Sequence, residues 1–308
     1  MTIERHTIIS RDQWLALRKQ DVTASRIGAL FSCHPYVSAL RVYLEHSGIE
    51  FPQEDNAAMR RGRLLESAVG LAVAEEHPEW RITKATEYLR DPDVRLGATP
   101  DFFIHDDPRG LGVLQTKTAS PHMFEREWAG GKEVPDWIVL QTLVECMLSD
   151  AAFGVVGVLE VNAWNLNCGI VEIPRHPAAE DKIIRAVKQF WGDVMYGHEP
   201  PPDYGKDAGL LKILAPREAK DKVIDLSGNN ALPVLLDERA RLKERIKKME
   251  SRCEEIETEL KFSMRDAAMA TGVNGFKITW KTAHYDEYIV KARDTRILKI
   301  HDLRKDDT

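Results

Sequence analysis

The sequence predicts an α/β fold in which helices flank a mixed central sheet. One observation is a helical apolar repeat at residues 57–77, followed by three strand-like runs at residues 80–89, 94–104 and 112–119. A second is an apolar helical segment at residues 137–150, followed by further strand-like runs at residues 153–161 and 168–173. Helices and strands that alternate in this way pack as layers around one sheet.

The N-terminal region, residues 11–50, is expected to be mostly helical, with Gly48 as the C-cap of its last helix. Thr23 and Ser25 precede a short helical stretch between the first and last helices. Hydroxyl side chains at such a position are expected to cap the first backbone amides, and they also suit a bound anion.

The helix predicted at residues 57–77 repeats apolar side chains at helical spacing, namely Leu64, Leu65, Ala68, Val69 and Ala72. Glu66 lies one to two positions off this stripe. The turn sequences "DPD" and "HDDPRG" separate the three strand-like runs that follow, and a later helix at residues 180–195 ends at Gly197.

The chain is expected to consist of a core at residues 1–205, a linker at residues 206–231 and an appendage at residues 232–308. The appendage opens with an a/d heptad seam formed by Leu242, Ile246, Met249, Cys253, Ile256 and Leu260. About three heptads fit a helical hairpin, packing against another helix or a coiled-coil dimer. The alternating run at residues 274–300 predicts a β-hairpin or small sheet.

Composition excludes several classes of protein. The 308 residues are 43% hydrophobic and 30% charged with a net charge of −6, which is typical of a soluble globular protein. No uncharged apolar run is long enough to span a bilayer, and the N-terminus has no apolar signal core, so we expect an intracellular protein without a membrane partner. The four cysteines form no CxxC pair, which argues against a zinc ribbon and a disulfide scaffold.

The candidate chemistry lies on two neighbouring strands. Asp101 interrupts the second strand-like run, and Gln115 and Lys117 lie two apart on the third, so they share one face. Phosphodiester hydrolysis calls for a divalent metal, and a hard cation prefers oxygen ligands such as carboxylates. Glu66, on the preceding helix, is placed to complete such a site.

These residues carry a family resemblance. "TPD" at Asp101 and "QTK" 14 residues later resemble the PD-(D/E)xK nuclease signature, with Gln115 where an acid is expected. The segment from Trp14 to Gly48, followed in order by "RRGRLLESAV", "GATPDF", "LQTKTA" and "LQTLVE", resembles the phage λ-exonuclease and YqaJ-like viral recombinase family over about residues 10–200. The resemblance implies a restriction-endonuclease-like core.

The resemblance also implies roles for individual residues. Glu66, Asp101 and Gln115 are expected to surround a magnesium site, with the last two as direct ligands and Mn²⁺ as an alternative metal. Lys117 is expected to assist the attacking water, and Gln141 matches a family glutamine near the site.

Arg18 and Ser25 match the positions that hold the 5′-terminal phosphate in these exonucleases. A guanidinium beside a hydroxyl and a helix start makes a physically sensible phosphate pocket.

The function that the resemblance implies is magnesium-dependent 5′ to 3′ exonuclease action on duplex DNA with 5′-phosphorylated ends. Its products would be single strands for phage-type homologous recombination in the cytoplasm of a bacterial host. The implied partners are a single-strand annealing protein and further copies of the chain in a ring-shaped homo-oligomer.

Gln115 leaves three interpretations open, because an amide keeps an oxygen but removes one negative charge from a metal site. The residue is a natural variant compensated by another acid, the mark of a weakly active DNA-end-binding homologue, or a substitution made to trap substrate. A structure-specific endonuclease of the same superfamily is a further alternative.

Overall fold

The computed structural model describes residues 2–51, 56–219, 222–273, 276–285, 298 and 300. The chain divides into two compact units, Met1–Leu214 and Ala215–Thr308, which are described separately. None of the helices in the described ranges is both long enough and apolar enough to cross a membrane.

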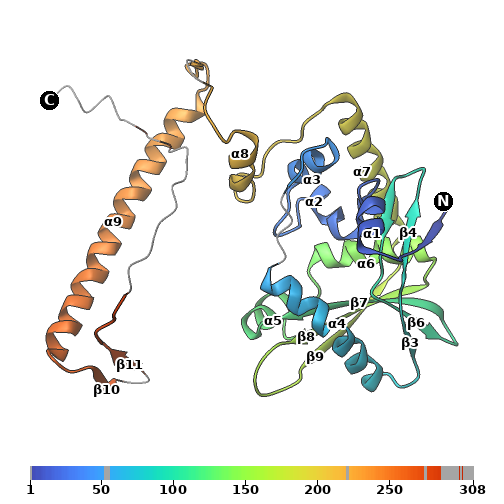
Figure 1. The fold of residues 1–308 in the computed structure, drawn as a ribbon, viewed down its shortest axis with the longest axis horizontal. Helices are drawn as coiled ribbons and strands as arrows, with labels where there is room; N and C mark the ends of the chain where they lie inside the picture. The colour runs from blue at the N-terminus through green and yellow to red at the C-terminus, as the bar shows by residue number, and fades with distance from the viewer. Residues whose placement is uncertain are drawn as a thin grey trace. The chain divides into compact units, whose positions relative to one another are not determined.

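A five-stranded mixed sheet forms the centre of the first unit (Figure 1). Its strands, in spatial order, are β3 (Arg81–Lys84), β6 (Phe102–Asp106), β7 (Gly110–Ala119), β8 (Phe153–Glu160) and β9 (Cys168–Pro174). β7 pairs with β8 in parallel, and the other neighbours are antiparallel. The predicted mixed sheet flanked by helices is therefore confirmed.

A second, four-stranded sheet lies in the same unit, with the order β1 (Glu4–Thr7), β4 (Glu87–Asp91), β5 (Leu96–Ala98) and β2 (Val22–Thr23). Two predicted strands are wrong in extent, because residues 80–89 divide into β3 and β4 and residues 94–104 divide into β5 and β6. The two halves of each segment belong to different sheets. The backbone amide of Ala85 donates to the carbonyl of Asp101 at 3.1 Å, so both chain segments pass between the sheets at one junction.

Helices α4 (Ala57–Glu76) and α6 (Asp136–Ser149) cover opposite faces of the five-stranded sheet. A Cβ added at Gly154 would meet Thr142 on α6, whereas one added at Gly157 would meet Val69 and Val73 on α4. Positions three apart on a strand point to opposite faces, so the two glycines mark where each helix packs closely against β8. The helix predicted at residues 57–77 corresponds to α4.

The remaining helical segments of the unit are α1 (Arg11–Arg18), η1 (Ala24–Arg26), α2 (Ile27–Leu30), α3 (Ala39–His46), α5 (Pro121–Trp128), α7 (Pro177–Tyr196) and α8 (Ala208–Leu214). The core between α6 and the sheet is apolar, and Ile138, Val144, Val156 and Val158 are fully buried in it. Polar side chains that enter this layer are therefore taken out of water, so each needs a partner.

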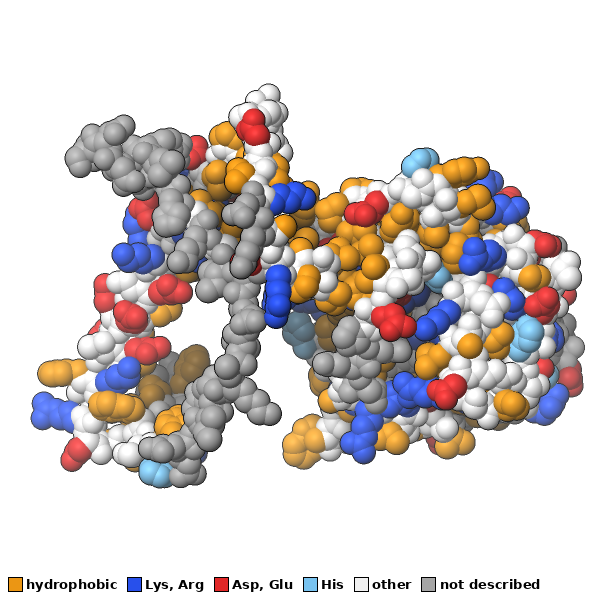
Figure 2. Space-filling view, turned by 45° about the horizontal axis from the view of Figure 1, so that its top comes forward, with side chains coloured by type: hydrophobic (Ala, Val, Ile, Leu, Met, Phe, Trp, Pro, Cys, Tyr) orange, Lys and Arg blue, Asp and Glu red, His pale blue; other side chains and the backbone are white. Residues whose placement is uncertain are grey.

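The second unit is built on one long helix, α9 (Ala231–Met264), followed by an antiparallel pair of strands, β10 (Met269–Val273) and β11 (Phe276–Thr279). The six predicted heptad positions all lie on α9, and each is exposed. Charged side chains of both signs lie among hydrophobic ones on this unit (Figure 2). The hairpin predicted at residues 274–300 falls mostly outside the described residues, and the described strand pair begins earlier, at Met269.

Candidate active site

Strand β7 directs Gln115 and Lys117 toward α6. In the parallel pairing with β8, Gln115 lies opposite Val156 and Lys117 opposite Val158, and both valines are buried in the core that contains α6. Gln115 is 2% exposed, whereas Lys117 is only partly buried. The strand period thus places an amide and an ammonium group side by side beneath one helix.

Asp101 lies at the junction between the two sheets and accepts three hydrogen bonds on one carboxylate oxygen. Its Oδ2 accepts from Gln115 Nε2 at 2.6 Å, from the Thr116 backbone amide at 2.8 Å and from Thr116 Oγ1 at 2.8 Å. Three donors on one carboxylate oxygen fix the orientation of the Asp101 side chain. The structure therefore brings the predicted pair Asp101 and Gln115 into direct contact.

Helix α6 extends this network to a fourth residue. Gln141 Nε2 donates to Gln115 Oε1 at 2.7 Å and to Glu145 Oε1 at 2.9 Å. The sequence analysis assigned no role to Glu145, the last residue of the segment "LQTLVE", which is 1% exposed in the structure. The available signal was its spacing of four residues from Gln141, because residues i and i+4 share one helix face.

The chemistry of the partners sets the direction of these bonds. A carboxylate only accepts, so the Gln115 amide must turn its NH₂ group toward Asp101 and its oxygen toward Gln141. Two buried oxygens, Gln141 Oε1 and Glu145 Oε2, have no hydrogen-bond partner in the described part of the chain. Buried acceptors are rarely left unsatisfied, so these two atoms are where a missing donor or cation would bind.

Burial also perturbs the ionisable groups beneath α6. It raises the pKa of Glu145 to about 8, and the Asp101 carboxylate adds to this effect, while the Gln141 hydrogen bond and Lys117 oppose it. Burial lowers the pKa of Lys117, against the pull of Asp101 and Glu145. Two acids and one lysine therefore act on one another in a poorly solvated space, which is typical of a catalytic centre.

Glu66, on α4, joins this region through Lys84 on β3. The two side chains form an ion pair, and Lys84 Nζ lies 4.6 Å from the centre of the Phe102 ring. Burial lowers the pKa of Lys84, and the charge of Asp101 partly offsets that effect. Among the hydrogen bonds of the described residues, none connects Glu66 directly to Asp101 or Gln115.

The predicted phosphate-binding pair is also brought together. Arg18 Nη2, at the end of α1, donates to Ser25 Oγ at 3.2 Å and to Thr23 Oγ1 at 3.4 Å. Burial lowers the pKa of Arg18, and its guanidinium lies 4.4 Å from the centre of the Trp14 ring. Thr23 is the N-cap of η1 but makes no capping bond, so the capping prediction is wrong, because the hydroxyl binds Arg18 instead.

Trp14 connects the Arg18 cluster, which consists of Arg18, Thr23 and Ser25, to the hydrogen-bond network around Asp101. Its Nε1 donates to Thr99 Oγ1 at 3.0 Å, two residues before Asp101. Helix α6 packs against η1 and β7, so the same helix borders both groups. A guanidinium and a carboxylate network are thus held in fixed relation on one scaffold, which suits a substrate carrying more than one phosphate.

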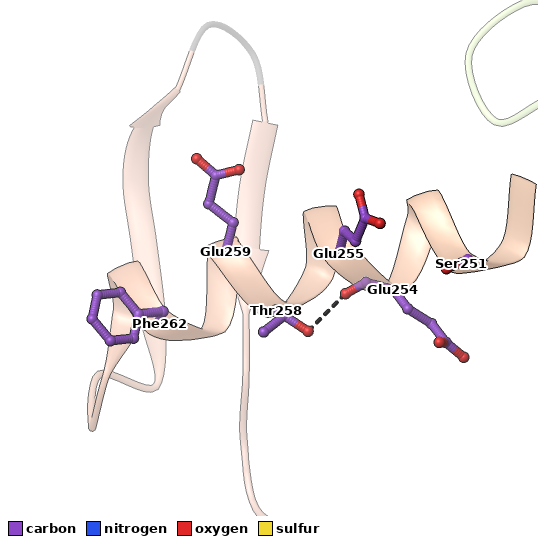
Figure 3. Close-up of a pocket in the computed structure, with 6 residues that line it drawn as sticks. All are labelled: Ser251, Glu254, Glu255, Thr258, Glu259 and Phe262. Carbon is purple, nitrogen blue, oxygen red and sulfur yellow. Dashed lines mark hydrogen bonds between the residues drawn. The ribbon is translucent and has the colours of Figure 1, made fainter. Parts of the chain in front are cut away.

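The surface hollows found along the second unit do not mark this chemistry. One of about 670 Å³ lies on α9 and is lined by Glu254, Glu255 and Glu259 among others (Figure 3). Its carboxylates would repel a phosphate backbone. Among the described residues, no three or more His, Cys, Asp and Glu side chains converge as a ready-made metal cage.

Comparison with known proteins identifies the domain. Residues 13–152 match the YqaJ-like viral recombinase domain, and this range contains every residue of the two clusters. The uncharacterized protein YqaJ of Bacillus subtilis (strain 168) is 23% identical over 288 residues, which cover 91% of this chain and 86% of YqaJ. The homology therefore extends well beyond the domain itself.

A solved structure supports the fold. The alkaline exonuclease LHK-Exo of Laribacter hongkongensis matches with a TM-score of 0.51 and 21% identity, covering 60% of this chain and 93% of that chain. A phage-related exonuclease from Haemophilus somnus 129PT matches with a TM-score of 0.45 and 14% identity, covering 57% of this chain and 96% of that chain. The resemblance predicted from the motifs is confirmed, because residues 13–152 match the YqaJ-like viral recombinase domain.

Proposed function

We propose that the chain is a metal-dependent deoxyribonuclease that degrades duplex DNA from a 5′-phosphorylated end. The observation that carries the proposal is the buried network of Asp101, Gln115, Gln141 and Glu145 beside Lys117. The match of residues 13–152 to the YqaJ-like viral recombinase domain supports it, as does the similarity to a structure named as an alkaline exonuclease. The single strands produced would serve phage-type homologous recombination.

The residues of the site fit a divalent cation, for which we propose Mg²⁺ with Mn²⁺ as a substitute. The available ligands are carboxylate and amide oxygens, which hard cations prefer. Two of them, Gln141 Oε1 and Glu145 Oε2, are buried acceptors without a donor in the described residues, so a cation would satisfy them. Bound near Asp101, the ion would supply positive charge for the phosphate oxygens and acidify a water.

The chain's own residues hold and orient the reacting groups. We assign to Lys117 the role of directing the attacking water, because the negative charge of Asp101 acts on its ammonium group. In the reaction, the water oxygen bonds to phosphorus and the bond from phosphorus to the leaving deoxyribose oxygen breaks. Glu66, paired with Lys84, keeps a second cationic group close to Asp101 on the opposite side of the sheet from α6.

Arg18, Thr23 and Ser25 are proposed to bind the terminal 5′-phosphate. A guanidinium and two hydroxyls offer donors to phosphate oxygens, and the sheltered position of Arg18 strengthens each bond. The contact through Trp14 and Thr99 would then set the distance between the bound end and the scissile bond.

The test is digestion of a 5′-phosphorylated linear duplex with Mg²⁺ or Mn²⁺, compared with a 5′-hydroxyl duplex and a closed circle. We expect the phosphorylated duplex to be degraded and the circle to remain intact. Asp101→Ala should abolish cutting, whereas Arg18→Ala should remove the preference for the 5′-phosphate and leave metal binding unchanged. Cutting by Asp101→Ala at the parent rate would contradict the assignment.

The same assay separates the two alternatives. Cleavage of the closed circle would indicate a structure-specific endonuclease. Cleavage that appears only after Gln115→Glu would indicate a DNA-end-binding homologue whose activity is weakened by the amide. The ring-shaped homo-oligomer and the single-strand annealing partner remain proposals from the family resemblance, and light scattering with and without DNA would measure the first.

A further inference from the structure

The strand position that normally carries the second acid is neutral in this chain, yet a second acid lies close by. Glu145 is 1% exposed and belongs to α6, one turn after Gln141. A carboxylate buried to this extent costs several kcal/mol unless it is paired or binds a metal. Its presence on an otherwise apolar helix therefore needs a reason.

Glu145 is linked to Gln115, the neutral residue on the strand, through the side chain of Gln141. The Gln141 amide donates to Gln115 Oε1 at 2.7 Å and to Glu145 Oε1 at 2.9 Å, so a single NH₂ group spans the strand and the helix. Glu145 also interacts electrostatically with Asp101 and Lys117. The site thus holds two acids, Asp101 and Glu145, and one lysine, Lys117. A complete PD-(D/E)xK signature would supply two acids and a lysine from the strands alone.

Gln115 is poorly disposed to be a metal ligand in this arrangement. Its NH₂ group faces Asp101 at 2.6 Å, and its oxygen already accepts from Gln141. A cation held by both Asp101 and the Gln115 oxygen would require the amide to rotate and to give up both bonds. By contrast, Glu145 keeps Oε2 without a hydrogen-bond partner among the described residues.

We propose that Glu145 supplies the second carboxylate of the divalent-cation site, in place of the acid that position 115 lacks, and that Gln115 is a positioning residue for Asp101 and Gln141. This assignment rests on the proposed function, because it requires a cation at Asp101. It deepens that function by explaining how a chain with an amide on the strand retains two acids. A purely structural Glu145 would affect cation binding only indirectly, through its hydrogen bond from Gln141.

The experiment measures Mn²⁺ binding to the full chain without DNA, from the loss of the electron paramagnetic resonance signal of free Mn²⁺. Glu145→Gln should weaken binding by more than the roughly 10–100-fold that loss of a supporting hydrogen-bond partner costs a metal site. The exchange variant, Gln115→Glu with Glu145→Gln, should recover most of the lost affinity, because it returns the charge to the strand. Both variants are isosteric with the parent.

Glu180→Gln is the matched control, since Glu180 is a buried glutamate on α7 that pairs with Arg175 rather than with the Asp101 network. It should bind Mn²⁺ like the parent. If Glu145→Gln does not fold, as judged by circular dichroism in EDTA, Glu145→Asp replaces it. That variant keeps the charge but withdraws it by one methylene, and it should also bind Mn²⁺ more weakly.

The outcomes distinguish failure of the role assigned to Glu145 from failure of the proposed function. Parent-like Mn²⁺ affinity in Glu145→Gln, together with weak binding in Asp101→Asn, would overturn the role of Glu145 and leave the proposed function standing. Failure of the exchange variant to recover affinity would also overturn it, because the carboxylate would then not be interchangeable. Parent-like affinity in Asp101→Asn, or no binding by the parent, would contradict the proposed function itself.

Discussion

Gln115→Glu tests how the metal-free site is held together. Gln115 Nε2 donates to Asp101 Oδ2 at 2.6 Å, so the substitution places a second carboxylate oxygen against the first. The variant loses a hydrogen bond to a charged group, a contribution of about 1.5–3 kcal/mol. Two unit charges about 4 Å apart repel by a further about 4 kcal/mol at an effective dielectric constant of about 20.

Protonation limits this repulsion and gives it a pH dependence. Keeping a glutamate of ordinary pKa about 4.3 protonated costs about 5 kcal/mol at pH 8 but only about 1 kcal/mol at pH 5. The protonated group also donates to Asp101 again. The folded variant therefore binds more protons than its unfolded state between these pH values, so its stability relative to the parent falls as pH rises.

Because protonation is the less costly route, we expect Gln115→Glu to lower the free energy of unfolding by about 5 kcal/mol at pH 8 and by about 1 kcal/mol at pH 5. Urea denaturation in EDTA measures both values. Gln20→Glu is the control, because Gln20 accepts from Arg90 at 3.1 Å and the new charge would lie beside a cation. A variant as stable as the parent at pH 8, or a deficit that does not change with pH, would show that the contact between Gln115 and Asp101 does not contribute as described.

Three further predictions concern the rest of the first unit. Burial lowers the pKa of His34 to about 4, and its Nδ1 accepts from two backbone amides at 3.1 Å, so stability should be fully present above pH 6.5 and fall by up to about 2 kcal/mol as pH drops through 4. His34→Asn retains an acceptor and should remove that pH dependence in urea titrations. Gly97→Ala should destabilise the fold by about 3 kcal/mol in thermal unfolding, because its Cβ would overlap the buried Tyr88 hydroxyl. Arg18→Lys should bind a 5′-phosphorylated duplex more weakly than the parent but match it on a 5′-hydroxyl duplex in fluorescence anisotropy, since lysine lacks the fork of donors.

Much of the central sheet could be predicted from sequence because its strands differ in period from its helices. Gln115 and Lys117 lie two apart, which is sufficient to place them on one face. The division of residues 80–89 and 94–104 between two sheets could not be predicted, since it depends on pairing between distant strands. The contact between Ala85 and Asp101 at the junction exists only in the folded chain.

The site was predicted incompletely for a similar reason. Asp101, Gln115 and Gln141 belong to recognisable motifs, and the structure brings them into one network. Glu145 ends the quoted segment "LQTLVE" but received no role there, because a glutamate on a helix is most often a solvated residue. Its burial, and hence its significance, follows from how α6 packs on β7 and β8, which the spacing of one helix does not specify.

The single amide of Gln141 that contacts both Gln115 and Glu145 has a consequence for how relatives of this chain are classified. Glutamate and glutamine have nearly the same volume, and their codons differ by one base. Two base changes, one at each position, therefore exchange the acid and the amide without altering the space that the buried site must fill. A search profile that scores the acid only on the strand would discard such sequences as degenerate, so homologues should be sorted by the residues at positions 115 and 145 together.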